Sequence, residues 1–240
     1  MHIRLRSSQL VWLVLSIVLV ADQVLKIWVK THLEYGEEFS LLGLPWAFIH
    51  FVENNGMAFG LSMGGDYGKL LLSLFRLIAV GFLFVFIRRL IQENASAGVI
   101  VGFALILAGA LGNILDSAFY GIIFSESPYY GGHAVLFPES GGYASFLHGK
   151  VVDMLYFPIA QGTWPEWVPW LGGQYFQFFK PVFNIADMAI TSGVLNVLIF
   201  QRHFFKKHAE STAQLIQEET TPPDADLPPG DDLPSEKVLS

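Results

Sequence analysis

The stretch Phe183-Asn184-Ile185-Ala186-Asp187 opens the last long apolar segment of the sequence, in which Asp187 is the only formal charge before Arg202. An Asp at the centre of a membrane helix costs about 2.5 to 3.5 kcal/mol on insertion scales. Acids at such positions usually face the interior of a helix bundle or a functional site. We therefore expect Asp187 to meet polar partners from elsewhere in the chain.

The composition indicates a membrane protein. Hydrophobic residues make up 52% and aromatic residues 15% of the 240 residues. Eight of the 21 acids and one of the 14 bases lie in residues 209–240, so the rest of the chain holds 13 of each and is neutral. No basic stripe is present, and no nucleic-acid partner is expected. Without cysteine, disulfides, thiolate nucleophiles and zinc–thiolate sites are excluded.

Four apolar runs predict membrane-spanning helices at about residues 9–30, 69–88, 95–117 and 181–203. The first run has the length of a signal-peptide core, and a cleaved signal peptide is the alternative, but its apolar pattern continues beyond Ala21. Basic residues precede the first run, separate the second from the third and follow the fourth. The positive-inside rule then places both termini in the cytoplasm and loops 31–68 and 118–180 outside.

This pattern predicts an all-α integral membrane four-helix bundle over residues 1–208, followed by a disordered acidic cytoplasmic tail at 209–240. In the first outer loop, short apolar runs and an Asn-Gly turn signal predict a small extramembrane β element. The second outer loop has a Gly-, Ser- and Tyr-rich part, residues 125–149, for which we expect no regular structure. The aromatic stretch Trp164–Trp170 is typical of a membrane interface.

Polar residues gather near the outer ends of the predicted helices. With a helix from residue 181, Asp187 lies roughly 8 to 10 Å below Pro181 at 1.5 Å per residue. Asp22, Asn113 and Asp116 fall in the same layer, and Asp153 lies in an apolar run of the second outer loop. Two carboxylates in a partly dry site share a proton, and such a pair can activate a water and protonate a leaving group.

Paired-aspartate peptide hydrolysis is therefore chemically available. The sequence has no His-Glu-x-x-His helix, no Gly-x-Ser-x-Gly elbow and no phosphate-binding Gly-Lys-Ser/Thr loop, and a Ser145/Lys150 pair is a minor alternative. Two other classes stay open, a small transporter or channel with an intramembrane carboxylate path and a non-catalytic membrane scaffold. Two carboxylates and water need neither a metal nor an organic cofactor.

Five short motifs occur in order along the chain. They are Asp22-Gln23 with Lys26, Asn54-x-Gly56-x-Ala58-Phe59, Gly109-x-x-Gly112-Asn113-x-x-Asp116, Gly149-x-Val151-Val152-Asp153 and Phe183-Asn184-x-Ala186-Asp187. Together they resemble the motifs of the lipoprotein signal peptidase (signal peptidase II) family. The resemblance covers most of residues 10–205 and excludes the acidic tail.

The resemblance implies a multi-pass aspartic endopeptidase of the bacterial inner membrane, with its active site near the outer, periplasmic face. It would cleave signal peptides from lipid-modified prolipoproteins before the diacylglyceryl-cysteine, as a monomer in contact with membrane lipids. Asp153 and Asp187 match the catalytic pair. The β element would form a periplasmic cradle and residues 164–170 part of the outer cover. The residues that would line or support the site are Asn54, Gly56, Gly109, Asn113, Asp116, Asn184 and Ala186, with Asp22 and Lys26 positioning helices.

Two features depart from the family pattern. Ser117 stands where many members have Arg, and Arg76 or Lys150 is a candidate replacement for that cation. The insert from Phe119 to Leu147 is longer than in compact members. We expect it to act as a lid, with a partner site or a tolerated surface loop as alternatives.

Overall fold

A computed structural model describes residues 6–55, 65–178 and 181–201. The chain divides into a unit of residues 1–200 and a unit of residues 201–240, and only the first is described in any detail. The predicted tail at 209–240 and the predicted site residue Gly56 lie outside the described residues.

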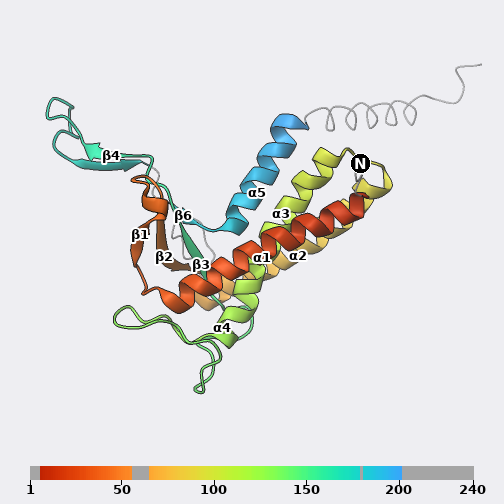
Figure 1. Cartoon of the computed structure of the whole chain (residues 1–240), viewed down its shortest axis with the longest axis horizontal. Coiled ribbons are helices and arrows are strands. Elements are labelled where there is room, and N and C mark those ends of the chain that lie inside the picture. The colour runs from red at the N-terminus through yellow and green to blue at the C-terminus, as the bar shows by residue number, and fades with distance from the viewer. Residues whose placement is uncertain (1–5, 56–64, 179–180, 202–240) are drawn as a thin grey trace, which may run out of the picture. The chain divides into compact units, whose positions relative to one another are not determined.

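The helices of the first unit are arranged around α3 (Ala97–Leu115), which contacts α1 (Ser7–His32), α2 (Gly65–Gln92) and α5 (Ile185–Leu195) (Figure 1). Beyond its C-terminal end, α3 continues through a π-helical turn, η3 (Asp116–Tyr120), and one further turn, α4 (Gly121–Ile123). Ser96 begins α3 as an N-cap, since its hydroxyl accepts a hydrogen bond from the Val99 amide at 3.3 Å.

Three helical segments of the described chain are long and apolar enough to cross a membrane, Ser7–His32, Tyr67–Gln92 and Ala97–Ile123. The helix Ile185–Phe200, formed by α5 and the π-helical turn η4 (Asn196–Phe200), is apolar but shorter. The described residues therefore show three of the four predicted spans at full length. α1 and α2 extend a few residues beyond both of their predicted ends.

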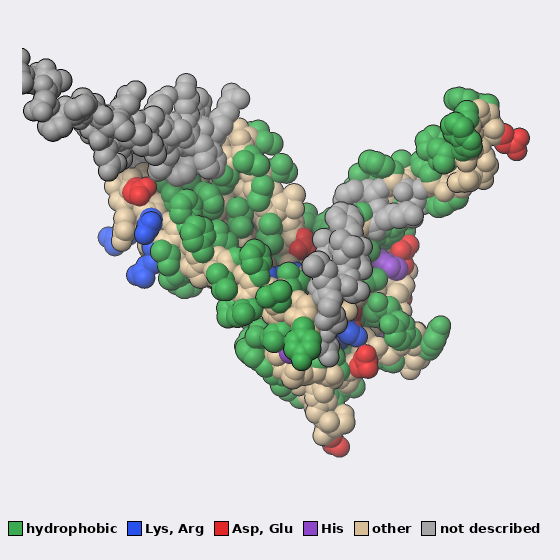
Figure 2. Space-filling view, turned by 180° about the vertical axis from the view of Figure 1, so that it is seen from behind, with side chains coloured by type: hydrophobic (Ala, Val, Ile, Leu, Met, Phe, Trp, Pro, Cys, Tyr) green, Lys and Arg blue, Asp and Glu red, His purple; other side chains and the backbone are tan. Residues whose placement is uncertain are grey.

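Apolar side chains cover the outer surfaces of these helices (Figure 2). On α2, the exposed residues Leu71, Phe75, Ile78 and Phe82 recur at helical spacing along one face. A face of this kind is typical of a helix in hydrocarbon, where apolar side chains need no cover.

The last helix begins later than predicted, which also changes the position of Asp187. Val182 and Phe183 form strand β6, paired with Tyr156 and Leu155. Helix α5 therefore begins at Ile185, and Asp187 lies in its first turn, not one to two turns deep. An apolar run does not by itself show where a strand ends and a helix begins, so the prediction treated both as one helix.

A four-stranded antiparallel sheet lies beside the C-terminal end of α1, in the order β1-β2-β3-β6. Strands β1 (Glu38–Ser40) and β2 (Phe48–Asn54) come from the first predicted outer loop, joined through the 3-10 turn η1 (Leu41–Gly43). Strands β3 (Val151–Tyr156) and β6 (Val182–Phe183) come from the second. The small β element is therefore present, but half of it comes from a loop in which no strand was predicted.

The aromatic stretch of the second outer loop is the tip of a separate two-stranded hairpin, β4 (Ala160–Thr163) and β5 (Tyr175–Phe178). Trp167 and Trp170 in this tip are 81% and 94% exposed. The interfacial role of Trp164–Trp170 stays a prediction.

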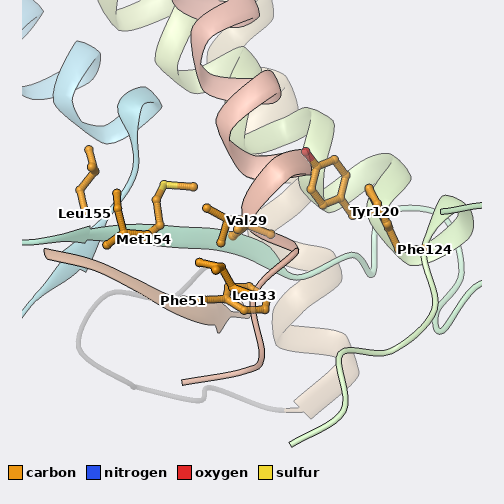
Figure 3. Packing of buried hydrophobic residues seen from close by; sticks show 9 residues of the cluster. Val29, Leu33, Phe51, Tyr120, Phe124, Met154 and Leu155 are labelled. Atoms are coloured by element: carbon orange, nitrogen blue, oxygen red, sulfur yellow. The ribbon is translucent and has the colours of Figure 1, made fainter. Parts of the chain in front are cut away.

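A cluster of buried apolar residues joins the sheet to the helices (Figure 3). Val29 of α1 and Leu33, the residue that follows this helix, pack with Phe51 of β2 and Met154 of β3, and all four are buried. Each such side chain contributes about 1.5 to 3 kcal/mol when it is fully buried. The same cluster includes Tyr120 and Phe124, so the beginning of the Phe119–Leu147 insert is part of the core.

Candidate active site

The first turn of α5 holds two of the predicted site residues in fixed positions. The Asp187 amide donates to Asn184 Oδ1 at 2.9 Å, and the Asn184 amide donates to Asp187 Oδ2 at 3.3 Å. This reciprocal pair is a capping box, in which each side chain satisfies an otherwise unpaired backbone donor. The Ala186 amide of the same turn donates to Asp22 Oδ1 of α1 at 2.9 Å, which joins the start of α5 to α1.

Asn184 also brings the two candidate catalytic acids together. Its Nδ2 donates to Asp153 Oδ1 at 2.7 Å, while its Oδ1 accepts from the Asp187 amide. Asp153 is on β3 and 4% exposed, and Asn184 is completely buried. One amide side chain thus contacts both acidic residues, one from the sheet and one from the helix.

Burial raises the pKa of the Asp153 carboxyl from 3.8 to about 7, and the charge of Asp187 acts in the same direction. Attraction from Lys26 and hydrogen bonds from Asn184 and Asn54 partly oppose this rise. At neutral pH Asp153 therefore exchanges a proton readily. This is the property required of a carboxyl that works as a general acid beside a second carboxylate.

A buried lysine organises the helices behind the two acids. Lys26 is completely buried, and its Nζ lies 2.9 Å from Asp22 Oδ2, 2.8 Å from Asp116 Oδ2 and 3.0 Å from Asn113 Oδ1. Burial of unpaired charges is costly, so the lysine and the two carboxylates depend on one another. Asn113 connects this group to the candidate catalytic residue, because its Nδ2 donates a hydrogen bond to Asp187 Oδ1 at 2.8 Å.

Asp116 connects this helix network to the sheet. Its Oδ2 accepts a hydrogen bond of 3.2 Å from the amide of Val152, the residue before Asp153. Asp116 is completely buried and begins the π-helical turn η3, a feature that is frequent at functional sites. The strand with Asp153 is therefore attached to α3 immediately beside the candidate catalytic acid.

The motif glycines allow α3 and α5 to approach closely. A Cβ on Gly109 would lie 2.1 Å from the Ala186 carbonyl oxygen. A Cβ on Gly112 would lie 2.8 Å from Asp22 Oδ2 and 3.0 Å from the Ala186 Cβ. Small residues at a helix interface allow this kind of backbone contact in membrane proteins. Gly109 and Ala186 thus act through packing, which places Asp187 against Asn113.

Ser117 occupies the position of the family arginine but does not replace it. Its hydroxyl is buried and donates to the Asn113 carbonyl at 3.0 Å. Of the two candidate replacements, Arg76 on α2 interacts electrostatically with Asp187, Asp116 and Asp153. Lys150 instead pairs with Glu53 at 3.6 Å and with Glu126 at 3.2 Å.

The structure brings most of the predicted site into one connected cluster. Its members are Asp22, Lys26, Asn54, Gly109, Asn113, Asp116, Asp153, Asn184, Ala186 and Asp187. In residues 6–55, 65–178 and 181–201, no group of three His, Asp or Glu residues is arranged as a metal site.

Gln23 belongs to the cluster although it was not among the predicted site residues. Its Nε2 donates to Asp116 Oδ1 at 2.9 Å, and its Oε1 accepts from the Tyr120 hydroxyl at 3.1 Å. Its place beside Asp22 was the available signal.

The chain is similar to several known proteins. A family described as Signal peptidase (SPase) II matches residues 14–204. A lipoprotein signal peptidase from Porphyromonas gingivalis is 47% identical over 197 residues, covering 82% of this chain and 84% of the relative. One from Amoebophilus asiaticus is 40% identical, covering 80% and 78%. A solved bacterial membrane enzyme is 24% identical, with a TM-score of 0.49, covering 80% of this chain and 86% of that one.

Proposed function

Because the chain belongs to the signal peptidase II family and is therefore a lipoprotein signal peptidase, we propose that Asp153 and Asp187 form its catalytic pair. The observation that carries this proposal is the Asn184 side chain, which contacts both residues. The family membership also favours hydrolysis over the transporter and scaffold alternatives. The substrates are prolipoproteins, cut before the lipid-modified cysteine.

The two carboxyls take complementary roles. Asp187 accepts hydrogen bonds at both oxygens, from Asn113 Nδ2 and from the Asn184 amide, and it takes a proton from the attacking water. The water oxygen bonds to the scissile carbonyl carbon while Asp153, with its raised pKa, protonates the carbonyl oxygen. The tetrahedral intermediate then collapses as one of its two hydroxyl groups returns a proton to the Asp153 carboxylate and re-forms the carbonyl. The C–N bond breaks, and the leaving nitrogen receives the proton held by Asp187.

The charges near the pair serve different purposes. Lys26 is committed to Asp22 and Asp116 and acts on Asp187 through Asn113. The charge of Arg76 acts on Asp187, Asp116 and Asp153. Arg76 therefore takes the place of the arginine that many family members have at the position of Ser117. It compensates negative charge when Asp187 is ionised.

The protein is a bacterial integral membrane protein, and its orientation follows from charge. Arg88 and Arg89 lie near the end of α2, and the predicted fourth span is followed by Arg202. The positive-inside rule places these residues and both termini in the cytoplasm and the sheet with Asp153 outside. Residues 1–208 form a monomeric four-helix peptidase domain in contact with lipid, and residues 209–240 form a cytoplasmic tail.

The decisive experiment measures cleavage of a lipidated precursor peptide by the purified full-length protein in detergent. Asp153→Asn and Asp187→Asn should each abolish product formation, detected by mass spectrometry of the new N-terminus. Glu166→Gln, which removes an exposed acid from the β4–β5 hairpin, is the matched control and should cleave normally. Turnover retained in either Asp variant would exclude the catalytic pair.

A further inference from the structure

A second buried polar cluster lies beside the active site and is unexplained by the catalytic scheme. Lys30 of α1 is completely buried and forms an ion pair with Glu53 of β2. Ser127, from the Phe119–Leu147 insert, contacts both partners, at 2.9 Å from Lys30 Nζ and 2.9 Å from Glu53 Oε1. Ser127 is itself only 4% exposed.

Lys30 is enclosed by the insert on several sides. Its Nζ lies 5.4 Å from the ring centre of Phe124 and 5.1 Å from that of Tyr143, both cation–π distances. The Lys30 carbonyl accepts from the Ala134 amide at 3.2 Å. The insert therefore supplies a hydroxyl, two aromatic faces and a backbone donor to a single residue of α1.

Glu53 is held at both carboxylate oxygens. Oε1 contacts Lys30 and Ser127, and Oε2 lies 3.6 Å from Lys150 Nζ, which also pairs with Glu126 of the insert at 3.2 Å. The Glu53 side chain is 2% exposed. A buried ion pair is seldom the most stable filling for a core, because desolvation offsets much of the attraction. The arrangement does, however, fix one carboxylate in one orientation.

The position of Glu53 connects this cluster to catalysis. Asn54, the next residue of β2, donates a side-chain hydrogen bond to Asp153. In the sheet, Glu53 pairs with Val152 and Val52 pairs with Asp153. Any shift of the end of β2 therefore moves Asn54 relative to the carboxyl it contacts.

We propose that Ser127 is a positioning residue, which holds Glu53 and through it keeps Asn54 against Asp153. The inference rests on the proposed role of Asp153. It gives the insert a function other than that of a lid: the insert is part of the support of the active site. Lys30 and Glu53 are the intermediates of this support.

The test compares Ser127→Ala with Ser125→Ala in the full-length enzyme, using a lipidated peptide over a range of concentrations. Ser125 is the matched control because, among the residues that the structure describes, its hydroxyl forms hydrogen bonds only within the insert, accepting from the Val135 amide at 2.8 Å and donating to the Glu126 carbonyl at 3.4 Å. Ser127→Ala should lower kcat about tenfold with KM unchanged, since a misplaced group can cost up to roughly 100-fold. Ser125→Ala should match the wild type, and Ser127→Thr should restore most of the rate.

A double-mutant cycle with Asn54→Ala decides whether the effect passes through Asn54. If it does, Ser127→Ala causes no further loss in the Asn54→Ala background. A kcat unchanged in Ser127→Ala, or independent losses in the cycle, would overturn the proposal. The proposal would also be overturned if Ser127→Ala and Ser125→Ala lowered kcat by the same factor and the melting temperature by the same amount.

A different result is expected if Asp153 is not a catalytic residue. In that case Asp153→Asn retains turnover, whatever the serine variants show. An inactive Asp153→Asn combined with a fully active Ser127→Ala overturns only the positioning role.

Discussion

Replacement of Asp153 with Asn should abolish activity and at the same time stabilise the protein at neutral pH. Asp153 is 4% exposed, and burial with the adjacent charge of Asp187 raises its pKa from 3.8 to about 7. Asn is neutral at every pH, has nearly the same size and keeps a carbonyl oxygen that can accept from Asn184. The substitution thus removes the ionisation without opening a cavity.

The sign and size of the stability change follow from the pKa shift. Between about pH 4 and pH 7 the folded protein binds the Asp153 proton and the unfolded chain does not, so folding stability falls as pH rises through this window. A shift of about 3 pKa units, at about 1.36 kcal/mol each, corresponds to about 4 kcal/mol by pH 7. The wild type loses this stability, and Asp153→Asn does not. At roughly 2 to 4 °C per kcal/mol, the melting temperatures should differ by about 10 °C.

The assay is thermal unfolding of both proteins in one detergent from pH 4 to pH 8, with lipopeptide cleavage measured at the same pH values. The two melting temperatures should agree near pH 4 and diverge towards pH 8, with Asp153→Asn the more stable. It should form no detectable product, since loss of a general acid or base costs roughly 10²- to 10⁴-fold in rate. Glu166→Gln should follow the wild type in both measurements. A melting-temperature difference that stays constant with pH would refute the reasoning, as would retained cleavage.

Three further predictions follow from the same site. The value of kcat/KM should fall above about pH 7 as the Asp153 proton is lost, and a profile flat from pH 5 to 9 would exclude Asp153 as the acid. Lys26→Met leaves Asp22 and Asp116 without their buried cation and should lower the free energy of unfolding by about 3 to 5 kcal/mol; partial recovery on adding Asp116→Asn would show that the loss is electrostatic. Gly109→Ala forces a Cβ against the Ala186 carbonyl. It should lower the free energy of unfolding by about 1 to 3 kcal/mol and should also lower activity. Gly81→Ala, in open space on α2, should be neutral or stabilising by up to about 1 kcal/mol, and equal effects of the two substitutions would contradict the packing argument.

The apolar runs predicted the main helices because membrane spans have a strong, local signal. Residues 7–32, 67–92 and 97–123 are recognisable from length and composition alone. The start of the last helix was wrong by about four residues, because an apolar strand, Val182–Phe183, precedes it directly. The boundary between the strand and the helix is set by the capping box of Asn184 and Asp187. These hydrogen bonds cannot be read from the hydrophobic composition of the segment.

Strands β3 and β6 of the four-stranded sheet were not predicted, for a different reason. Strand β3 appeared as an apolar run in a loop, and its pairing with β2 joins residues about a hundred positions apart. No local pattern reports such a pairing. Lys30, Glu53 and Ser127 were missed in the same way, since each looks like an ordinary loop or helix-end residue until the fold brings them together.

The hydrogen bond from the Ala186 amide to Asp22 spans 164 positions of the chain, nearly its whole membrane domain. During synthesis the first helix emerges long before this donor exists. Asp22 and Lys26 must therefore enter the bilayer before their final partner has been made, and Asp153 lacks Asn184 until the last helix arrives. With the proposed catalytic pair, the nascent chain has no assembled proteolytic centre. Activity is then expected only after the ribosome has completed the segment that carries Asn184 and Asp187.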